Sequence, residues 1–343
     1  MKLKYIKVIL IITLLILAYE SSSAGPRGRL GTSAAPELMI PLGSVGTSLQ
    51  GSNIAYVTGI DAMFWNPAGL SQLSTTTGEA LFSHMNYVAD IDMQYVAGVV
   101  KIGNLGVIGA SLRSLNIGEE IVTTEFFPEG TGETFSPTYL VMNLSYARAM
   151  TDKIHFGTNI KLINERIAEV SATGVAFDFG LQYVAGKSGL RFGITLKNLG
   201  PSMRFDGPGL DATFIENGHE VVRRVILQDF QLPTSLEIGL SYSATFGTNN
   251  HVSLSSSFQN NSYSSDEYRF GLEYDYNRNI FFRGSMNILP DKEENEALFG
   301  PTFGAGVKYP FGNVTLGFDY AYRIVNEDGF DSTNQFFTLN VGF

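Results

Sequence analysis

The side chains of this chain that could carry out catalysis or bind a metal are few and scattered. The four histidines, His84, His155, His219 and His251, lie far apart, and there is no cysteine. No H-x-x-x-H or H-E-x-x-H spacing occurs, so the common patterns of zinc sites are absent. The G-x-S-x-G pattern of a serine nucleophile is also absent. The sequence therefore predicts no catalytic residue, no cofactor and no metal site; a serine–histidine pair formed across strands is the only enzymatic alternative.

A second group of polar side chains consists of charges set into otherwise apolar stretches. A charge removed from water requires a partner, and residues of both signs are present in these stretches. We therefore expect a network of ion pairs in the interior of the protein, with a path for protons or substrate as the alternative. The predicted members are Lys161, Asp178, Arg191, Glu237, Arg269, Glu273, Arg283, Asp319 and Arg323.

Two long segments, 118–136 and 199–232, are candidates for binding a partner. The first contains Phe126 and Phe127, and the second contains Arg223 and Arg224 beside valine and isoleucine residues. Loops on a rigid scaffold often carry binding residues, and apolar side chains next to charge suit a protein partner or an amphipathic ligand. The alternative is that both segments pack over the rest of the structure.

The elements that must position these side chains are β-strands of about ten residues. Leu316, Phe318, Tyr320 and Tyr322, for example, alternate with smaller or polar residues. Such runs are typical of transmembrane strands, whereas a soluble sandwich has shorter strands and more charge on its polar faces. The predicted strands are 78–88, 91–101, 104–117, 137–151, 153–166, 171–186, 188–198, 233–246, 249–260, 265–277, 278–289, 299–310, 312–325 and 333–343.

The links between these strands alternate in length. After every even-numbered strand the link is very short, whereas most links after odd-numbered strands are longer: 118–136, 167–170, 199–232, 261–264, 290–298 and 326–332. Short turns at one end and long loops at the other are typical of bacterial outer-membrane barrels, which have an even number of strands. We therefore predict an all-β protein, a transmembrane antiparallel β-barrel of about 14 strands that spans residues 78–343.

The C-terminal stretch is expected to close the barrel. Phe337, Leu339, Val341 and Phe343 occupy every second position of a strand that ends the chain, so they share one face. We expect this face to contact lipid and the strand to pair with the first strand near 81–87. Many outer-membrane barrels end in an aromatic strand that serves as an assembly signal, and this role is predicted for the four residues.

The N-terminal segment predicts the compartment. Residues 1–24 combine three lysines, an apolar run and a small-residue end, which is the pattern of a secretory signal peptide. The net charge of −10 argues against a nucleic-acid partner. We expect a bacterial outer-membrane protein that contacts membrane lipid and has both termini in the periplasm.

Residues 25–77 alternate poorly and are predicted to form a separate N-terminal segment. They contain the motif Trp65, Asn66, Pro67, Ala68, Gly69 and Leu70. Pro67 fixes its own φ and keeps Asn66 out of the helical region, while Gly69 permits a tight turn. The motif resembles the N-P-A-G-L signature of FadL-like barrels and of their PorV/PorQ relatives in particular. Stretches 82–87, 130–135, 189–193 and 197–205 add to the resemblance, whereas 42–56 departs from the family pattern.

The resemblance implies a small plug, formed by 25–77, inside a FadL-like barrel. It also implies two possible functions. A PorV/PorQ protein would be a type IX secretion component that docks to the translocon and receives cargo proteins. A FadL-like protein would transport hydrophobic small molecules, with a ligand or lipid in the lumen. The motif itself is expected to fold the plug, with gating or ligand contact as the alternative.

Overall fold

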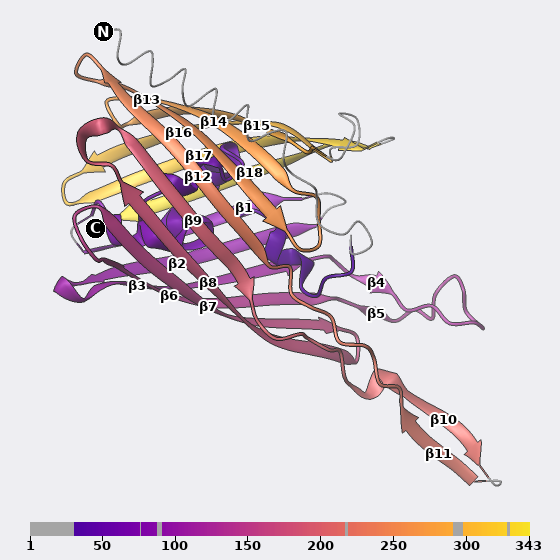
Figure 1. The fold of residues 1–343 in the computed structure, drawn as a ribbon. Helices are drawn as coiled ribbons and strands as arrows, with labels where there is room; N and C mark the ends of the chain where they lie inside the picture. The colour runs from indigo at the N-terminus through magenta and orange to yellow at the C-terminus, as the bar shows by residue number, and fades with distance from the viewer. Residues whose placement is uncertain (1–30, 76, 88–90, 217–218, 291–297, 328–329) are drawn as a thin grey trace.

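The computed structural model describes residues 31–75, 77–87, 91–216, 219–290, 298–327 and 330–343. The predicted signal peptide, 1–24, lies outside this range. The chain forms a closed antiparallel barrel of fourteen strands, as predicted (Figure 1). The barrel strands are β1 (Gly78–Asn86), β2 (Asp92–Ile102), β3 (Gly106–Asn116), β6 (Thr138–Ala149), β7 (Ile154–Ile167), β8 (Val170–Val184), β9 (Leu190–Leu199), β12 (Ser235–Phe246), β13 (Asn250–Asn261), β14 (Glu267–Tyr276), β15 (Ile280–Ile288), β16 (Phe299–Phe311), β17 (Val314–Glu327) and β18 (Phe330–Gly342).

The last strand closes the barrel against the first. Pairing between β1 and β18 runs from Glu79 opposite Gly342 to Asn86 opposite Gln335. The backbone of Phe343 continues this pairing, because its carbonyl accepts from the N–H groups of Thr77 and Gly78. The predicted partner region of the terminal strand, 81–87, is therefore confirmed.

The outer face of the barrel is apolar and the inner face is polar. Leu339 is 53% exposed and Phe318 is 43% exposed, whereas the inward-facing Thr338 and Asp319 are buried. This alternation is the pattern of a transmembrane β-barrel. In the described ranges, no helix has the length and apolarity that crossing a membrane would require.

The long links gather at one end of the barrel. Two of them contain small sheets of their own, β4 (Glu120–Ile121) with β5 (Thr134–Phe135) and β10 (Asp211–Glu216) with β11 (His219–Arg224). Both project beyond the barrel strands on the same side (Figure 1). Two predictions of a longer link were wrong. Only residues 168 and 169 separate β7 from β8, and β17 and β18 remain paired through 326 and 331. Backbone pairing does not depend on apolar alternation, so a hairpin can continue where its sequence pattern has ended.

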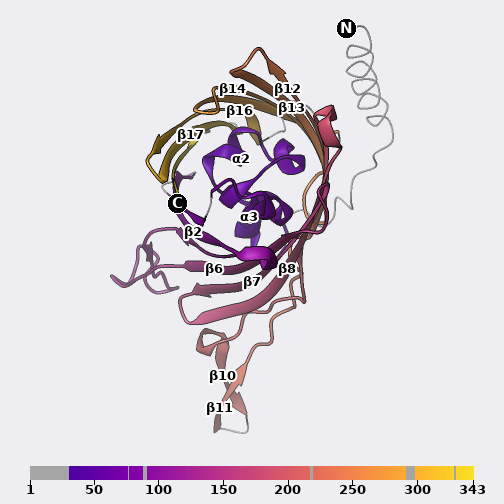
Figure 2. The same cartoon turned by 90° about the vertical axis from the view of Figure 1, so that its left-hand side faces the viewer.

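Residues 34–73, which we call the inner segment, lie within the barrel (Figure 2). They form six short helices, η3 (Pro36–Met39), α2 (Ser44–Ser48), η4 (Ser52–Ala55), η5 (Gly59–Asp61), α3 (Ala62–Trp65) and η6 (Pro67–Gln72). Leu49, Ile54 and Leu70 are fully buried there. The inner segment therefore supplies much of the apolar core of a barrel whose own inward side chains are mostly polar.

Hydrogen bonds attach the inner segment to opposite parts of the wall. The Ser44 hydroxyl donates to the Phe336 carbonyl on β18 at 3.1 Å, and Ser285 on β15 donates to the Ser48 carbonyl at 2.9 Å. On the other side, Gln182 of β8 donates to the carbonyls of Ile54 and Val57. These contacts hold the segment across the barrel and define the floor of the cavity described next.

Candidate functional site: a cavity inside the barrel

The predicted motif forms the turn between α3 and η6. Asn66 is the N-cap of η6, and its side-chain oxygen accepts from the Ala68 N–H at 3.2 Å. Its amide nitrogen donates to the carbonyl of Ile54, 2.9 Å away, and to that of Leu181 on β8. Asn66 therefore stabilises the turn and also connects it to the wall.

Two strand glycines allow this turn to approach the wall. A Cβ on Gly157 of β7 would lie 2.2 Å from the Pro67 carbonyl carbon, and one on Gly180 of β8 would lie 2.2 Å from Asn66 Oδ1. Real Cβ atoms do not approach backbone this closely, so these positions require glycine. The wall surface that the motif contacts is therefore determined by glycines in the sequences of two strands.

Trp65 lies above this turn. Its indole N–H donates to the Leu42 carbonyl at 3.0 Å, and its ring packs edge-on against Phe64 with 4.9 Å between centroids. The ammonium of Lys197 on β9 lies 4.9 Å from the Phe64 centroid and 5.2 Å from that of Trp65. A cation over aromatic rings is attracted by their π-electrons, so Lys197 holds both rings in place.

These residues line a cavity of about 570 Å³ that we call the lumen cavity. Its volume lies in the range of small-molecule sites, about 300–1,000 Å³. The floor is the inner segment, and the walls come from strand ends beside the long links. The apolar lining includes Leu38, Ile40, Phe64, Trp65, Leu115, Ile117, Tyr87, Tyr139, Leu298 and Phe299.

Charged side chains form part of the same lining. Lys197 pairs with Glu237 at 2.9 Å, and Arg269 pairs with Glu267 at 3.0 Å. Arg323 differs, because none of the carboxylates whose side chains the structure describes lies within ion-pair distance of it. Its guanidinium donates to Asn334 Oδ1 and stacks on the Phe299 ring with 3.7 Å to the centroid. The lumen cavity thus combines aromatic walls with a cation, Arg323, that pairs with no acid among the described side chains.

The predicted charge network is divided among separate groups. Lys161 pairs with Asp178 at 2.7 Å near β7 and β8. On the opposite side, Arg283 of β15 pairs with Glu273 at 2.6 Å and with Asp319 at 2.7 Å. Glu237 pairs with Lys197 and Arg269 with Glu267. Arg191, like Arg323, has no acidic partner at ion-pair distance among the described residues.

Sequence reasoning missed a further buried group of charges. Glu37, Arg113 and Glu165 are at most 4% exposed, and the described residues offer no hydrogen-bond partner to either Glu37 oxygen or to two of the Arg113 nitrogens. Burial raises the pKa of Glu37, and the Arg113 charge opposes this increase. Arg113 and Glu165 occupy inward-facing positions of their alternating strands, so the sequence pattern could have indicated them. Glu37 lies outside any alternating stretch.

Asp61 in the inner segment is a second titratable group in an unusual setting. Its Oδ1 is buried and has no hydrogen-bond partner in the part of the chain that the structure describes. Burial raises the pKa of Asp61 to about 7, and the nearby Asp319 carboxylate adds to the increase. The folded protein therefore keeps a proton on Asp61 at pH values where the unfolded chain has lost it.

This shift predicts how stability depends on pH. The contribution of Asp61 is complete below about pH 4, the ordinary carboxyl pKa, and decreases as the pH rises toward 7. In Asp61→Asn this decrease should be smaller by up to about 1.4 kcal/mol per pH unit. Thermal unfolding of both proteins in detergent between these pH values measures the difference. The prediction would be contradicted if the stabilities of the two proteins changed equally with pH.

The predicted loop residues lie outside the cavity and apart from each other. Phe126 and Phe127, between β4 and β5, are 87% and 60% exposed. Arg223 and Arg224 lie on β11, where they pair with Glu216 and Asp211 across the hairpin. The two projections are separate (Figure 1). Among the described residues, no three or more His, Asp or Glu side chains are grouped to hold a metal.

Comparisons with known proteins place the fold. No protein-family model matches the chain, and no curated protein sequence is similar to it. Similar solved structures include the CymD monoaromatic hydrocarbon channel, with TM-score 0.54, 14% identity, and coverage of 88% of this chain and 97% of that one. The toluene transporter TbuX of Ralstonia pickettii gives TM-score 0.52, 16% identity, and 88% and 97% coverage. The toluene transporter TodX of Pseudomonas putida has a TM-score of 0.53 and 15% identity, with coverage of 88% of this chain and 96% of that one. The chain therefore shares the β-barrel fold of these hydrocarbon channels and transporters over nearly their whole length.

Proposed function

We propose that this protein is an outer-membrane channel for hydrophobic small molecules, with the lumen cavity as its binding site and the inner segment as its plug. The lumen cavity is the observation that carries the proposal. It is enclosed by barrel strands, floored by the inner segment and lined by aromatic and aliphatic side chains. Apolar cavities with a few polar groups are the usual form of small-molecule sites.

The orientation follows from the links. In outer-membrane barrels long loops are extracellular and short turns are periplasmic. The described parts of the long links 117–137 and 200–234 lie at the end where the lumen cavity is found. We infer that ligand enters from outside and meets the inner segment next. The C-terminus would then be periplasmic, as predicted from the sequence, because Phe343 pairs with Gly78 at the short-turn end. The first described residues lie instead at the long-link end, where the Ala34 N–H donates to the Gln231 carbonyl, and the predicted periplasmic N-terminus lies outside the described residues.

The lining indicates which molecules fit. Phe64, Trp65, Tyr139 and Phe299 offer aromatic surface to an apolar body. Arg323 offers a cation that has no acidic partner among the described side chains, which suits a single anionic group. We therefore infer that ligands are hydrophobic molecules, including those with one carboxylate. The similar solved structures, a monoaromatic hydrocarbon channel and toluene transporters, support the hydrophobic class.

The second hypothesis from the sequence, a type IX secretion component that docks to a translocon, gains no support from the comparisons. The resemblance to PorV/PorQ in particular also gains none. The exposed apolar side chains of the two projections remain its only structural support, with Ile215 and Ile226 about 80% exposed. The lumen cavity gives transport the stronger case.

The single tryptophan allows a direct test. Because Trp65 is the only Trp and lines the lumen cavity, toluene or laurate binding there should quench its fluorescence saturably. Asn287→Phe, which adds a ring to the cavity lining, should weaken binding at least about ten-fold, the equivalent of 1.4 kcal/mol. The control is Gln94→Phe, at an exposed position on the outer face of β2. The proposal fails if neither probe changes the emission, or if both variants bind as well as the original protein.

A further inference from the structure

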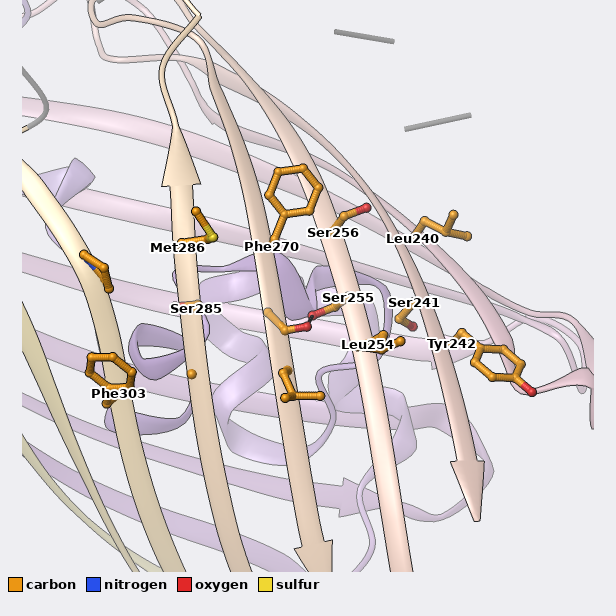
Figure 3. Close-up of a pocket in the computed structure, with 14 residues that line it drawn as sticks. Leu240, Ser241, Tyr242, Leu254, Ser255, Ser256, Phe270, Ser285, Met286 and Phe303 are labelled. Atoms are coloured by element: carbon orange, nitrogen blue, oxygen red, sulfur yellow. Dashed lines mark hydrogen bonds between the residues drawn. The ribbon is translucent and has the colours of Figure 1, made fainter. Parts of the chain in front are cut away.

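A second cavity lies on the outside of the barrel, over strands β12 to β16, and we call it the wall groove (Figure 3). Its volume is about 610 Å³. The inner-segment helices lie on the other side of the wall. The groove is therefore not a part of the lumen cavity, and the proposed transport function does not use it.

Two rows of outward side chains form its sides. The strand registers place Leu240, Ser256, Phe270 and Met286 in one row. They place Tyr242, Leu254, Leu272, Gly284 and Phe303 in the other. The rows are two residues apart along each strand, or about 7 Å. The first row crosses four strands and the second crosses five, or about 19 Å. The groove is thus long and narrow.

Small residues in these rows deepen the groove. Ser256 is only 7% exposed although it points outward, while its row neighbour Met286 is 51% exposed. Gly284 has no side chain where the flanking position is Phe303. A Cβ on Gly284 would meet nothing closer than Phe303 Cδ1 at 3.6 Å, so the space above it is open.

The lining carries no charged side chain. The serines between the rows point inward, where Ser255 contacts the Ser52 hydroxyl at 2.9 Å and Ser285 donates to the Ser48 carbonyl. Nothing in the groove would hold a polar headgroup. The groove also lies at mid-strand and is continuous with the apolar outer face, where a transmembrane barrel meets lipid tails. Its shape, chemistry and depth fit one hydrocarbon chain.

The groove ends at a weak point in the wall. Pairing between β15 and β16 stops at Ser285 opposite Thr302, although β15 continues to Ile288. Pro301 has no N–H to donate, and the register toward β17 shifts beside it. From inside, the Gln50 amide donates to the Gly300 carbonyl at 2.8 Å. We call this unpaired stretch, 286–288 with 299–301, the seam.

The two cavities meet at the seam from opposite sides. Met286 and Pro301 line the wall groove, whereas the adjacent Asn287 and Phe299 line the lumen cavity. We propose that the wall groove binds one hydrocarbon chain of a membrane lipid, which covers the seam from the membrane side. At the seam, packing of this hydrocarbon chain closes the wall, whereas elsewhere hydrogen bonds between neighbouring strands close it.

Native mass spectrometry of barrels extracted with mild detergent from phosphatidylethanolamine vesicles tests this. The original protein should retain one phosphatidylethanolamine through delipidation. Gly284→Leu fills the groove and should lower this occupancy at least ten-fold. Gly98→Leu is the matched control, because Gly98 is also exposed on the outer face and has nothing within 4 Å of a Cβ.

The lumen variant Asn287→Phe should leave the retained lipid unchanged, which separates this inference from the proposed transport. Heat-modifiable migration on gels checks that each variant is folded, and Ser256→Leu fills the same groove if Gly284→Leu does not fold. The inference is overturned if the groove-filling variant retains as much lipid as Gly98→Leu. It is also overturned if the original protein retains no lipid.

Discussion

Arg283→Met is expected to lower the free energy of unfolding by about 3–5 kcal/mol. Arg283 is almost fully buried and holds Glu273 at 2.6 Å and Asp319 at 2.7 Å. Among the described residues, Arg283 is the only cation at ion-pair distance from these two carboxylates. Methionine removes it, and a buried unpaired charge is very costly. Urea denaturation of the barrel in detergent, followed by heat-modifiable migration, measures the loss.

Two further variants separate this effect from the loss of any arginine. Arg148→Met removes an exposed arginine near the end of β6 and should change stability by less than about 0.5 kcal/mol. Adding Glu273→Gln and Asp319→Asn to Arg283→Met should restore part of the stability, because no uncompensated charge then remains. If Arg283→Met unfolds at the same urea concentration as Arg148→Met, the ion-pair cluster does not stabilise the barrel.

Leu339→Lys is the second substitution with a large expected effect, a destabilisation of up to about 4 kcal/mol and poor membrane assembly. Leu339 points outward from the closing strand between Phe82 on β1 and Phe318 on β17. A lysine there would face lipid without a partner. The amount of heat-modifiable barrel in the membrane fraction gives the result.

The neighbouring positions provide a graded control. Val341→Lys also faces outward but lies nearer the strand end, so its effect should be smaller, because the cost falls toward the interfaces. Asn340→Lys lies between them and points into the barrel, so it should assemble well. Deletion of Phe343 removes the backbone hydrogen bonds to Thr77 and Gly78 and should also impair closure. Equal assembly of all four variants would show that the outward face of β18 is not an assembly signal.

The pattern of the strands could be predicted from the sequence because it is local. Each wall strand must be apolar at every second residue over about ten residues, whatever its neighbours are. The strand number, the closure of β18 on β1 and the outward position of Phe337 and Leu339 all follow from that requirement. The link 326–332 was misjudged because pairing there continues without alternation.

Partners within the lumen could not be predicted in the same way. Alternation shows that Arg283 and Asp319 point inward, but it does not show that they meet. They lie on β15 and β17, with β16 between them, and a Cβ on the intervening Gly306 would lie 2.0 Å from Asp319 Oδ1. The pair depends on the registers of three strands and on one glycine. Arg323 was expected in the same network, yet it stacks on Phe299 instead.

The sequence by itself therefore determined the barrel, its closing strand and the side of the wall on which each strand residue lies, since these depend only on residues adjacent in the chain. The tertiary structure alone decided which charges pair, where the lumen cavity lies and where the wall groove and the seam form. These features depend on strand registers and on the path of residues 34–73 across the barrel. Both bring together residues up to about 290 positions apart, such as Ser44 and Thr338, and no local pattern records such contacts.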